Sequence, residues 1–247
     1  MVLFSMRHAF GAVALALLPA FAACNPSSSS SSSPNPSGGG GGDGGSGLSV
    51  AAVASGGSCP APTGAGTVHS ENVTADEVWT AAGSPHQITA NLRIKATVRV
   101  EACAVITIKP GVVVSIGDSA PPVGALVTEG TYDEAKNEAR PVVIRSAEDN
   151  AYFGSLFVYP NSRLDLTMTA IVRGGDVNAG AGAIEARGTQ AKPLTKNLRM
   201  RGVFVVDSGS TGVTLNSYAA FTDDSEALFV TGSGKQPESD PRLFTGF

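Results

Sequence analysis

Short runs in which apolar and polar residues alternate recur along most of the chain. Leu92 and Ile94 flank Arg93, and the alternation returns at Val98, Val100, Ile106, Ile108, Val112, Val114, Ile116, Val142, Ile144, Val203, Val205, Val213 and Leu215. A period of two in short runs that are bounded by Gly, Pro, Asn and Asp predicts half-buried strands. The sequence lacks the pattern of long amphipathic helices, which excludes the common α/β folds.

Two all-β architectures fit these strands. A sandwich would join them by tight Asn-Gly or Asp-Gly turns, and no such turn is flanked by strands in this sequence. A parallel β-helix instead stacks short strands around an aliphatic interior, which suits a chain with 42% hydrophobic but only 6% aromatic residues. Four asparagines recur 17 or 19 residues apart and could stack as a ladder in a β-helix: Asn161, Asn178, Asn197 and Asn216. The alternative is that asparagine simply favours turns.

The first 24 residues have the pattern of an export signal. A short basic head precedes an apolar run over residues 9–18, about half the length of a membrane-spanning helix, and small residues follow. The segment Phe21-Ala22-Ala23-Cys24 resembles a bacterial lipobox, which implies a signal peptide over residues 1–23 and a lipid on Cys24. Ordinary secretion with cleavage after Ala22 is the alternative.

Residues 24–58 are expected to form a flexible tether. Seven serines in residues 27–33 and five glycines in residues 38–42 cannot bury a core. A tether behind a lipid anchor would hold a folded domain clear of the membrane. We therefore expect the protein at the outer membrane or cell surface, with the membrane as a partner through the lipid. Without the anchor it would be secreted or periplasmic.

The cysteine count agrees with an anchor. If Cys24 carries the lipid, Cys59 and Cys103 remain, and an exported compartment lets them form a disulfide. Two buried free thiols are the alternative. A metal site is poorly supported, because two cysteines this far apart lack the close spacing of zinc ligands.

Four segments carry a resemblance to a known family. They are residues 105–117, 124–130, 140–146 and 153–158, and Trp79-Thr80 with Ser84-Pro85-His86 fits the lead-in. The segments and their order are similar to the coils of extracellular right-handed parallel β-helix proteins, the pectin-lyase-like superfamily. This resemblance implies an all-β fold, a single-stranded right-handed parallel β-helix over residues 86–235. Because the first strand edge needs a cover, residues 59–85 are the expected N-terminal cap, and residues 236–247 are a C-terminal tail or a truncated end.

One helix signal interrupts this pattern. Thr74-Ala75-Asp76-Glu77 fits a capping box, and Gly83 with Pro85 would end the helix after at most two turns. A strand or turn that enters the domain is the alternative.

Enzymes of the pectin-lyase-like superfamily cleave polysaccharides, but their motifs are incomplete here. Arg93-Ile94-Lys95 and Asp223-Asp224 resemble polygalacturonase motifs in reversed order, and Gly-His-Gly is missing. Arg140-Pro141 with Arg145 misses the spacing of the pectate-lyase motif. We therefore expect no catalytic residue, and we interpret Arg93 and Lys95 as outward residues of a strand.

Acidic residues and histidines offer few candidates for a cofactor site. Asp223, Asp224 and Glu226 could hold calcium, which prefers several oxygen ligands, but no calcium-binding repeat surrounds them. An acidic solvated turn is the alternative reading, as it is for Glu148-Asp149. The two histidines after the signal, His69 and His86, are interpreted as surface or packing residues. We expect no cofactor beyond this calcium candidate.

Charge and fold together point to a function class. A formal net charge of −4 with 15% charged residues offers no basic patch for nucleic acid. We expect a lipid-anchored cell-envelope protein that is a non-catalytic binding or structural module for extended polymers such as glycans. This expectation rests on fold analogy. A polysaccharide lyase or hydrolase with a divergent site is the alternative.

Overall fold

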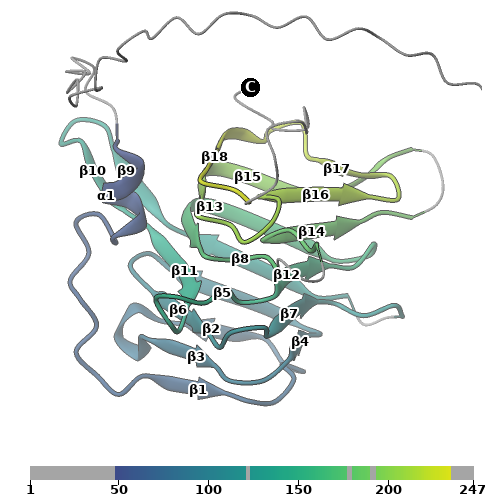
Figure 1. Ribbon diagram of the computed structural model, residues 1–247, viewed down its shortest axis with the longest axis horizontal. Helices are drawn as coiled ribbons and strands as arrows, with labels where there is room; N and C mark the ends of the chain where they lie inside the picture. The colour runs from purple at the N-terminus through teal and green to yellow at the C-terminus, as the bar shows by residue number, and fades with distance from the viewer. Residues whose placement is uncertain (1–47, 121–122, 177–179, 190–192, 235–247) are drawn as a thin grey trace, which may run out of the picture. The chain divides into compact units, whose positions relative to one another are not determined.

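The computed structural model describes residues 48–120, 123–176, 180–189 and 193–234. These residues form a parallel β-helix, in which successive coils of the chain stack and their strands pair side by side (Figure 1). The expected signal peptide, Cys24, the tract up to residue 47 and the tail from residue 235 lie outside the described residues. Among the described residues, none of the helices has the length and apolarity to cross a membrane.

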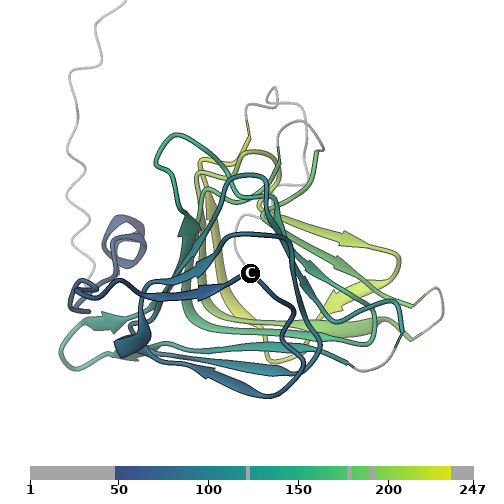
Figure 2. The same cartoon turned by 90° about the horizontal axis from the view of Figure 1, so that it is seen from below.

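Three walls of strands surround the interior, as the view along the stack shows (Figure 2). The first face contains β2 (Glu77–Trp79), β5 (Thr97–Glu101), β8 (Ala125–Glu129), the first halves of β13 (Arg163–Val172) and β15 (Thr195–Val206), and β17 (Ala219–Phe221). The second face contains β1 (Thr67–His69), β3 (His86–Ile88), β6 (Val105–Ile108), β11 (Val142–Ser146), the second halves of β13 and β15, and β18 (Glu226–Thr231). The third face contains β4 (Leu92–Ile94), β7 (Val113–Ile116), β12 (Ser155–Val158), β14 (Ile184–Arg187) and β16 (Val213–Asn216).

The two longest strands each turn a corner of the stack. β13 pairs with β8 through its first residues and with β11 through its last, and β15 follows it in register. Met168 and Gly202 occupy the corner in successive coils, and both have a positive φ, of 40° and 62°. The left-handed backbone at this position bends the strand from the first face to the second, and the register is the same on both sides of the corner.

The alternating residues place an aliphatic ladder inside the stack. On the third face, Ile94 pairs with Ile116, which pairs with Val158, and all three are fully buried. Along each strand, the residues that alternate with these buried ones point outward, so each strand is half-buried as the period of two predicts. The expected all-β parallel architecture is therefore confirmed.

Turn side chains bind the next coil in the first part of the stack. The Oδ1 atoms of Asn72, Asp76 and Asn91 accept hydrogen bonds from the backbone N–H groups of Arg93, Thr97 and Val113, at 2.8–2.9 Å. Each bond spans 21 or 22 residues, which is the length of one coil. These contacts satisfy backbone donors at the starts of strands and so fix the register between coils.

The asparagine ladder, one of the two readings of this spacing, does not form between Asn197 and Asn216. Asn197 lies on β15 and donates to the carbonyl oxygen of Arg187, whereas Asn216 lies on β16, on another face, and donates to Glu185. Asn178 lies outside the described residues. Coils of unequal length place residues of constant spacing on different walls, so the side chains do not stack.

Residues 48–58 are ordered, although we expected them to belong to the tether. They contain α1 (Val50–Ala54), whose N-cap Ser49 accepts a hydrogen bond from the N–H of Ala52. Val53 is fully buried against Val143, Ala170 and Phe204 on the outer side of the second face. This helix forms because that wall has apolar residues at outward positions, and burial stabilises a helix too short to persist alone.

Residues 59–85, the expected N-terminal cap, join the stack as its first coil. β1 pairs with β3, β2 pairs with β5, and Val73 bridges to Ile94. Of the two readings of residues 74–83, the strand or turn is correct and the two-turn helix is wrong: residues 77–79 are a strand, and only the 3₁₀ turn η1 (Ala81–Gly83) is helical. Asp76, which lies within the expected capping box, instead accepts a hydrogen bond from the N–H of Thr97 in the next coil.

The disulfide between Cys59 and Cys103 is present, with a Cα–Cα distance of 5.3 Å. It joins the segment after α1 to the corner between β5 and β6.

Sequence reasoning did not predict the hairpin of β9 (Thr131–Asp133) and β10 (Glu138–Arg140). Among the named strands of the described residues, these two form the antiparallel pair. This hairpin is inserted between β8 and β11, so the coil that contains it is longer than its neighbours.

Candidate functional site

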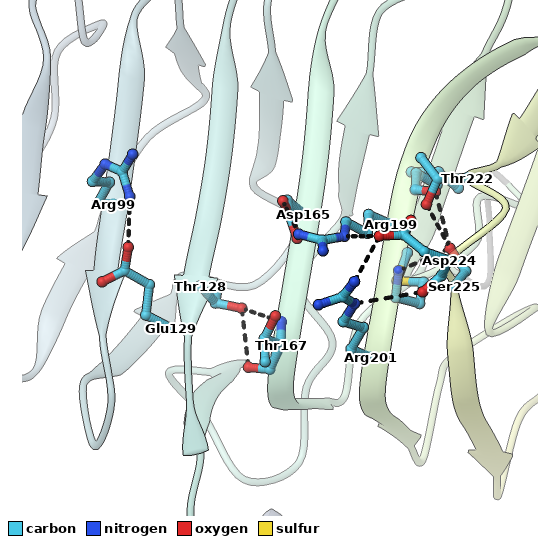
Figure 3. A network of polar contacts seen from close by, with 12 residues as sticks. Arg99, Thr128, Glu129, Asp165, Thr167, Arg199, Arg201, Thr222, Asp224 and Ser225 are labelled. Carbon is cyan, nitrogen blue, oxygen red and sulfur yellow. Dashed lines mark hydrogen bonds and ion pairs between the residues drawn. The ribbon is translucent and has the colours of Figure 1, made fainter. Parts of the chain in front are cut away.

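A network of ion pairs crosses the outer side of the first face near the C-terminal end of the stack (Figure 3). Arg199 of β15 contacts Asp165 of β13 at 3.1 Å and Asp224 at 2.9 Å. Arg201, two residues further on β15, contacts the same Asp224 oxygen at 2.6 Å. We call Asp165, Arg199, Arg201 and Asp224 the first-face network. It forms because outward positions of adjacent parallel strands lie opposite each other, as Asp165 and Arg199 do.

The three acidic residues proposed as calcium ligands lie in or beside this network, each opposite a different set of residues of β15. Asp224 belongs to it, Asp223 contacts Lys196 Nζ at 2.6 Å, and Glu226 is the register partner of Arg201. In the part of the chain that the structure describes, no three His, Cys, Asp or Glu side chains gather as metal ligands would. Cations of β15 therefore occupy the places around Asp223 and Asp224 where a calcium ion would need further oxygens.

Asp224 is held as a carboxylate. The Thr222 hydroxyl, which also lies 3.0 Å from Ser225 Oγ, and the guanidinium groups of Arg199 and Arg201 lower the pKa of Asp224 to about 2. At neutral pH this carboxyl group is ionised, and it cannot donate a proton as a general acid would.

We expect Asp224→Asn to lower stability at neutral pH and to lose this effect in acid. The folded-state pKa lies below the ordinary value of 3.8, so the ionised carboxylate contributes its full stability above about pH 4 and loses it as the pH falls toward about 2. Urea unfolding of the wild type and the variant between pH 7 and pH 2 measures the difference. Asp149→Asn is the control, because Asp149 is fully exposed and lies 3.9 Å from Arg173. A difference that persists at pH 2 would contradict this origin.

The outer side of the third face carries an in-register row of polar and aromatic residues. Neighbouring strands pair so that one residue of each stands in line: Arg93, Ser115, Phe157, Glu185 and Thr214. We call this set the third-face row. The outward position of Arg93 agrees with the sequence interpretation, as does that of the partly exposed Lys95.

One end of the third face is cationic but neutralised in part. Arg93 and Lys95 contact Asp118 at 2.8 and 3.1 Å. Hydrogen bonds from Lys95, the backbone N–H of Ser119 and Arg93 hold the pKa of Asp118 well below its ordinary value. The third face therefore presents an ionised carboxylate between two cations at this end.

The middle of the third face is aromatic. Phe157 and Tyr159 meet edge to face with ring centroids 4.9 Å apart, and the Arg187 guanidinium lies 4.8 Å from the Phe157 centroid. Glu185 contacts Arg187 at 3.6 Å and accepts a hydrogen bond from Asn216 at 3.1 Å. These contacts hold half-buried rings beside groups that donate and accept hydrogen bonds.

The structure does not bring the polysaccharide-enzyme candidates together. Arg93 and Lys95 lie at the third face, whereas Asp223 and Asp224 lie beside the first face several coils further along the stack. Glu148 and Asp149 occupy an exposed turn after β11. Exposed Arg140 and Arg145 belong to β10 and β11. A cleaving site would need an acid, a base and a binding cation at one place.

Sequence reasoning missed the pairing of the two histidines. His69 Nε2 lies 3.1 Å from His86 Nδ1, and the ring of Trp79 packs 4.2 Å from His69. No signal in the sequence could have found this pair, because a 17-residue spacing does not match a 21-residue coil. His69 and His86 lie on paired strands, but they are not register partners: His86 pairs with Thr67 and His69 with Ile88.

Comparison with known proteins finds no relative: no family model, no curated protein and no solved structure matches the chain.

Proposed function

We propose that the protein is a lipid-anchored cell-envelope β-helix protein of the pectin-lyase-like superfamily that binds extended polymers, such as glycans, without cleaving them. The observation that carries this proposal is the third-face row, in which five adjacent strands each present one outward side chain in register. The lipobox-like residues ending at Cys24 and the Ser/Gly tract support the anchor and a place at the outer membrane or cell surface.

The spacing of the third-face row suits a polymer that lies along the stack. Parallel strands are about 4.8 Å apart, so an extended chain meets a new side chain at each step. The rings of Phe157 and Tyr159 offer apolar surface to the C–H faces of a sugar, while Arg187, Glu185 and Asn216 can bond its hydroxyl groups.

The state of the carboxylates supports binding without cleavage. Asp118, Asp165 and Asp224 each lie within 3.1 Å of a guanidinium or ammonium group. Glycoside hydrolases pair two carboxyl groups, one of which is kept protonated. The cations around Asp118 and Asp224 favour the opposite state.

Polysaccharide retention tests the proposal. The protein is incubated with soluble and insoluble polysaccharides, with and without calcium, and both co-sedimentation and new sugar ends are measured. We expect retention without new ends, and we expect Phe157→Ala to weaken it roughly fivefold because an aromatic contact is worth about 1 kcal/mol. Arg99→Ala is the matched control: Arg99 is exposed, ion-paired to Glu129 at 2.7 Å and located on the first face.

The other outcomes separate the competing functions. New sugar ends would support a lyase or hydrolase and overturn the non-catalytic proposal. No retention on any polymer would leave a structural role in the envelope. Equal loss with Phe157→Ala and Arg99→Ala would move the binding surface away from the third-face row.

A further inference from the structure

A chain of hydrogen bonds links two histidines on neighbouring strands at the N-terminal end of the stack. His69 of β1 and His86 of β3 lie on the lowest strands in Figure 1, with Trp79 of β2 against both rings. His69 Nε2 lies 3.1 Å from His86 Nδ1, and His86 Nε2 lies 2.9 Å from the carbonyl oxygen of Thr80. Trp79 and His86 are buried, with 2% and 3% of their surface exposed.

The partners of these atoms determine where the protons are. A carbonyl oxygen only accepts, so His86 Nε2 carries a hydrogen and donates it to Thr80. The Nδ1 atom of a neutral His86 is then an acceptor, and His69 Nε2 must donate to it. Both imidazoles are neutral in this arrangement, and His69 Nδ1 is left as the atom that can take a further proton.

Protonation of His69 Nδ1 and protonation of His86 Nδ1 have different effects on the hydrogen bonds between the two rings. A first proton on His69 Nδ1 leaves every hydrogen bond of the chain intact. A second proton must go to His86 Nδ1, where it would face the N–H of His69 across 3.1 Å, with both rings charged. Two donors and two cations cannot share this contact, so the rings must separate when both are protonated.

The charged groups around the pair do not compensate for a second charge. Glu77 attracts protons to both rings, but its carboxylate is engaged by Trp79 Nε1 at 2.8 Å, and Glu101 of β5 accepts from the N–H of Ala81 at 3.1 Å. Burial, followed by the charge of His86, lowers the pKa of His69. Burial also lowers the pKa of His86, against the opposing effects of the Thr80 carbonyl and Glu77.

β1 is weakly attached apart from this contact. It is the terminal strand of its sheet, and it pairs with β3 over three residues. Val68 at its centre is 60% exposed, and Thr67 adds one side-chain bond to the carbonyl oxygen of Gly83. Separation of the two rings would leave β1 held by its three-residue pairing with β3 and by the hydroxyl bond of Thr67.

We propose that double protonation of the His69–His86 pair releases β1 and opens the N-terminal edge of the stack. The released histidines regain their ordinary affinity for protons, so opening takes up protons and is favoured in acid. The closed first coil keeps its full stability above the unperturbed histidine value of 6.5 and loses it as the pH falls below that value. This inference does not depend on the proposed polymer binding.

The single tryptophan of the chain reports directly on the pair. Trp79 emission and amide hydrogen exchange of β1 are followed in the full-length protein from pH 7.5 to pH 4.5. We expect a red shift of the emission together with at least a tenfold loss of protection in β1, while β7 stays protected. A decrease of emission intensity without loss of protection in β1 would mean that the pair takes protons in place, and it would overturn the proposal.

His69→Gln is the decisive variant, because its amide can donate to His86 Nδ1 but cannot be protonated. We expect it to keep β1 protected to a pH at least one unit lower than in the wild type. Thr67→Val is the matched control: it weakens β1 but keeps both imidazoles, so its acid transition persists. Opening of His69→Gln at the wild-type pH would also refute the proposal. If the variant does not fold, the wild-type comparison of emission and exchange decides alone.

Discussion

Simultaneous replacement of Cys59 and Cys103 by serine is expected to lower the free energy of unfolding by about 4 kcal/mol. The disulfide spans 44 residues, so its loss restores the freedom of a long loop to the unfolded chain. For a domain of this size, the expected fall in melting temperature is roughly 8–16 °C. Urea and thermal unfolding of the variant and the oxidised wild type measure both quantities.

Two comparisons isolate the disulfide in that experiment. The wild type unfolded in the presence of a reductant should match the double serine variant, while Cys24→Ser should match the oxidised wild type. A loss below about 1 kcal/mol would mean that strand pairing of β1 and β2 alone holds residues 59–85 in place.

Phe153→Ala is expected to cost about 3–5 kcal/mol. Phe153 has no exposed surface, and its ring fills the space over Gly174, where an added Cβ would lie 2.5 Å from Phe153 Cζ. Removal of the ring leaves a cavity between two coils that glycine cannot fill. Denaturant unfolding, with a check that the m-value is unchanged, gives the difference.

Phe157→Ala provides the matched control. It also removes a phenylalanine ring, but Phe157 lies four residues after Phe153 and on the outer side of the third face. We expect it to cost less than about 1.5 kcal/mol, because Phe157 is only half-buried and loses an edge-to-face contact and a guanidinium contact. Equal costs for the two variants would show that the interior is packed no better than the surface.

The architecture was predictable because its signal is local. Alternation at positions such as Ile94 and Ile116 reports burial directly, and the pairing of Cys59 with Cys103 followed from the cysteine count once Cys24 was assigned to the lipid. α1 was not predictable, because five residues have little helix stability of their own. It depends on Val143, Ala170 and Phe204, which are distant in sequence.

The third-face row could not be read from the sequence, because register depends on coil length. Ile94 pairs with Ile116 after 22 residues, but Ile116 pairs with Val158 after 42, since the β9–β10 hairpin lies between them. Any fixed period therefore misassigns the later coils, as it did for the asparagines. The histidine pair was missed for the same reason.

The position of the disulfide determines how the stack would respond to mechanical load. A pull on the chain at Leu48 reaches α1 first, then Ser58, which bonds the carbonyl oxygen of Ala139, and then Cys59. At Cys59 a covalent bond diverts the force to Cys103, so β1 lies outside the loaded path. Without that bond the same pull would peel strands one at a time from the end of the stack. With it, the tension enters at the corner between β5 and β6, where several coils share it at once.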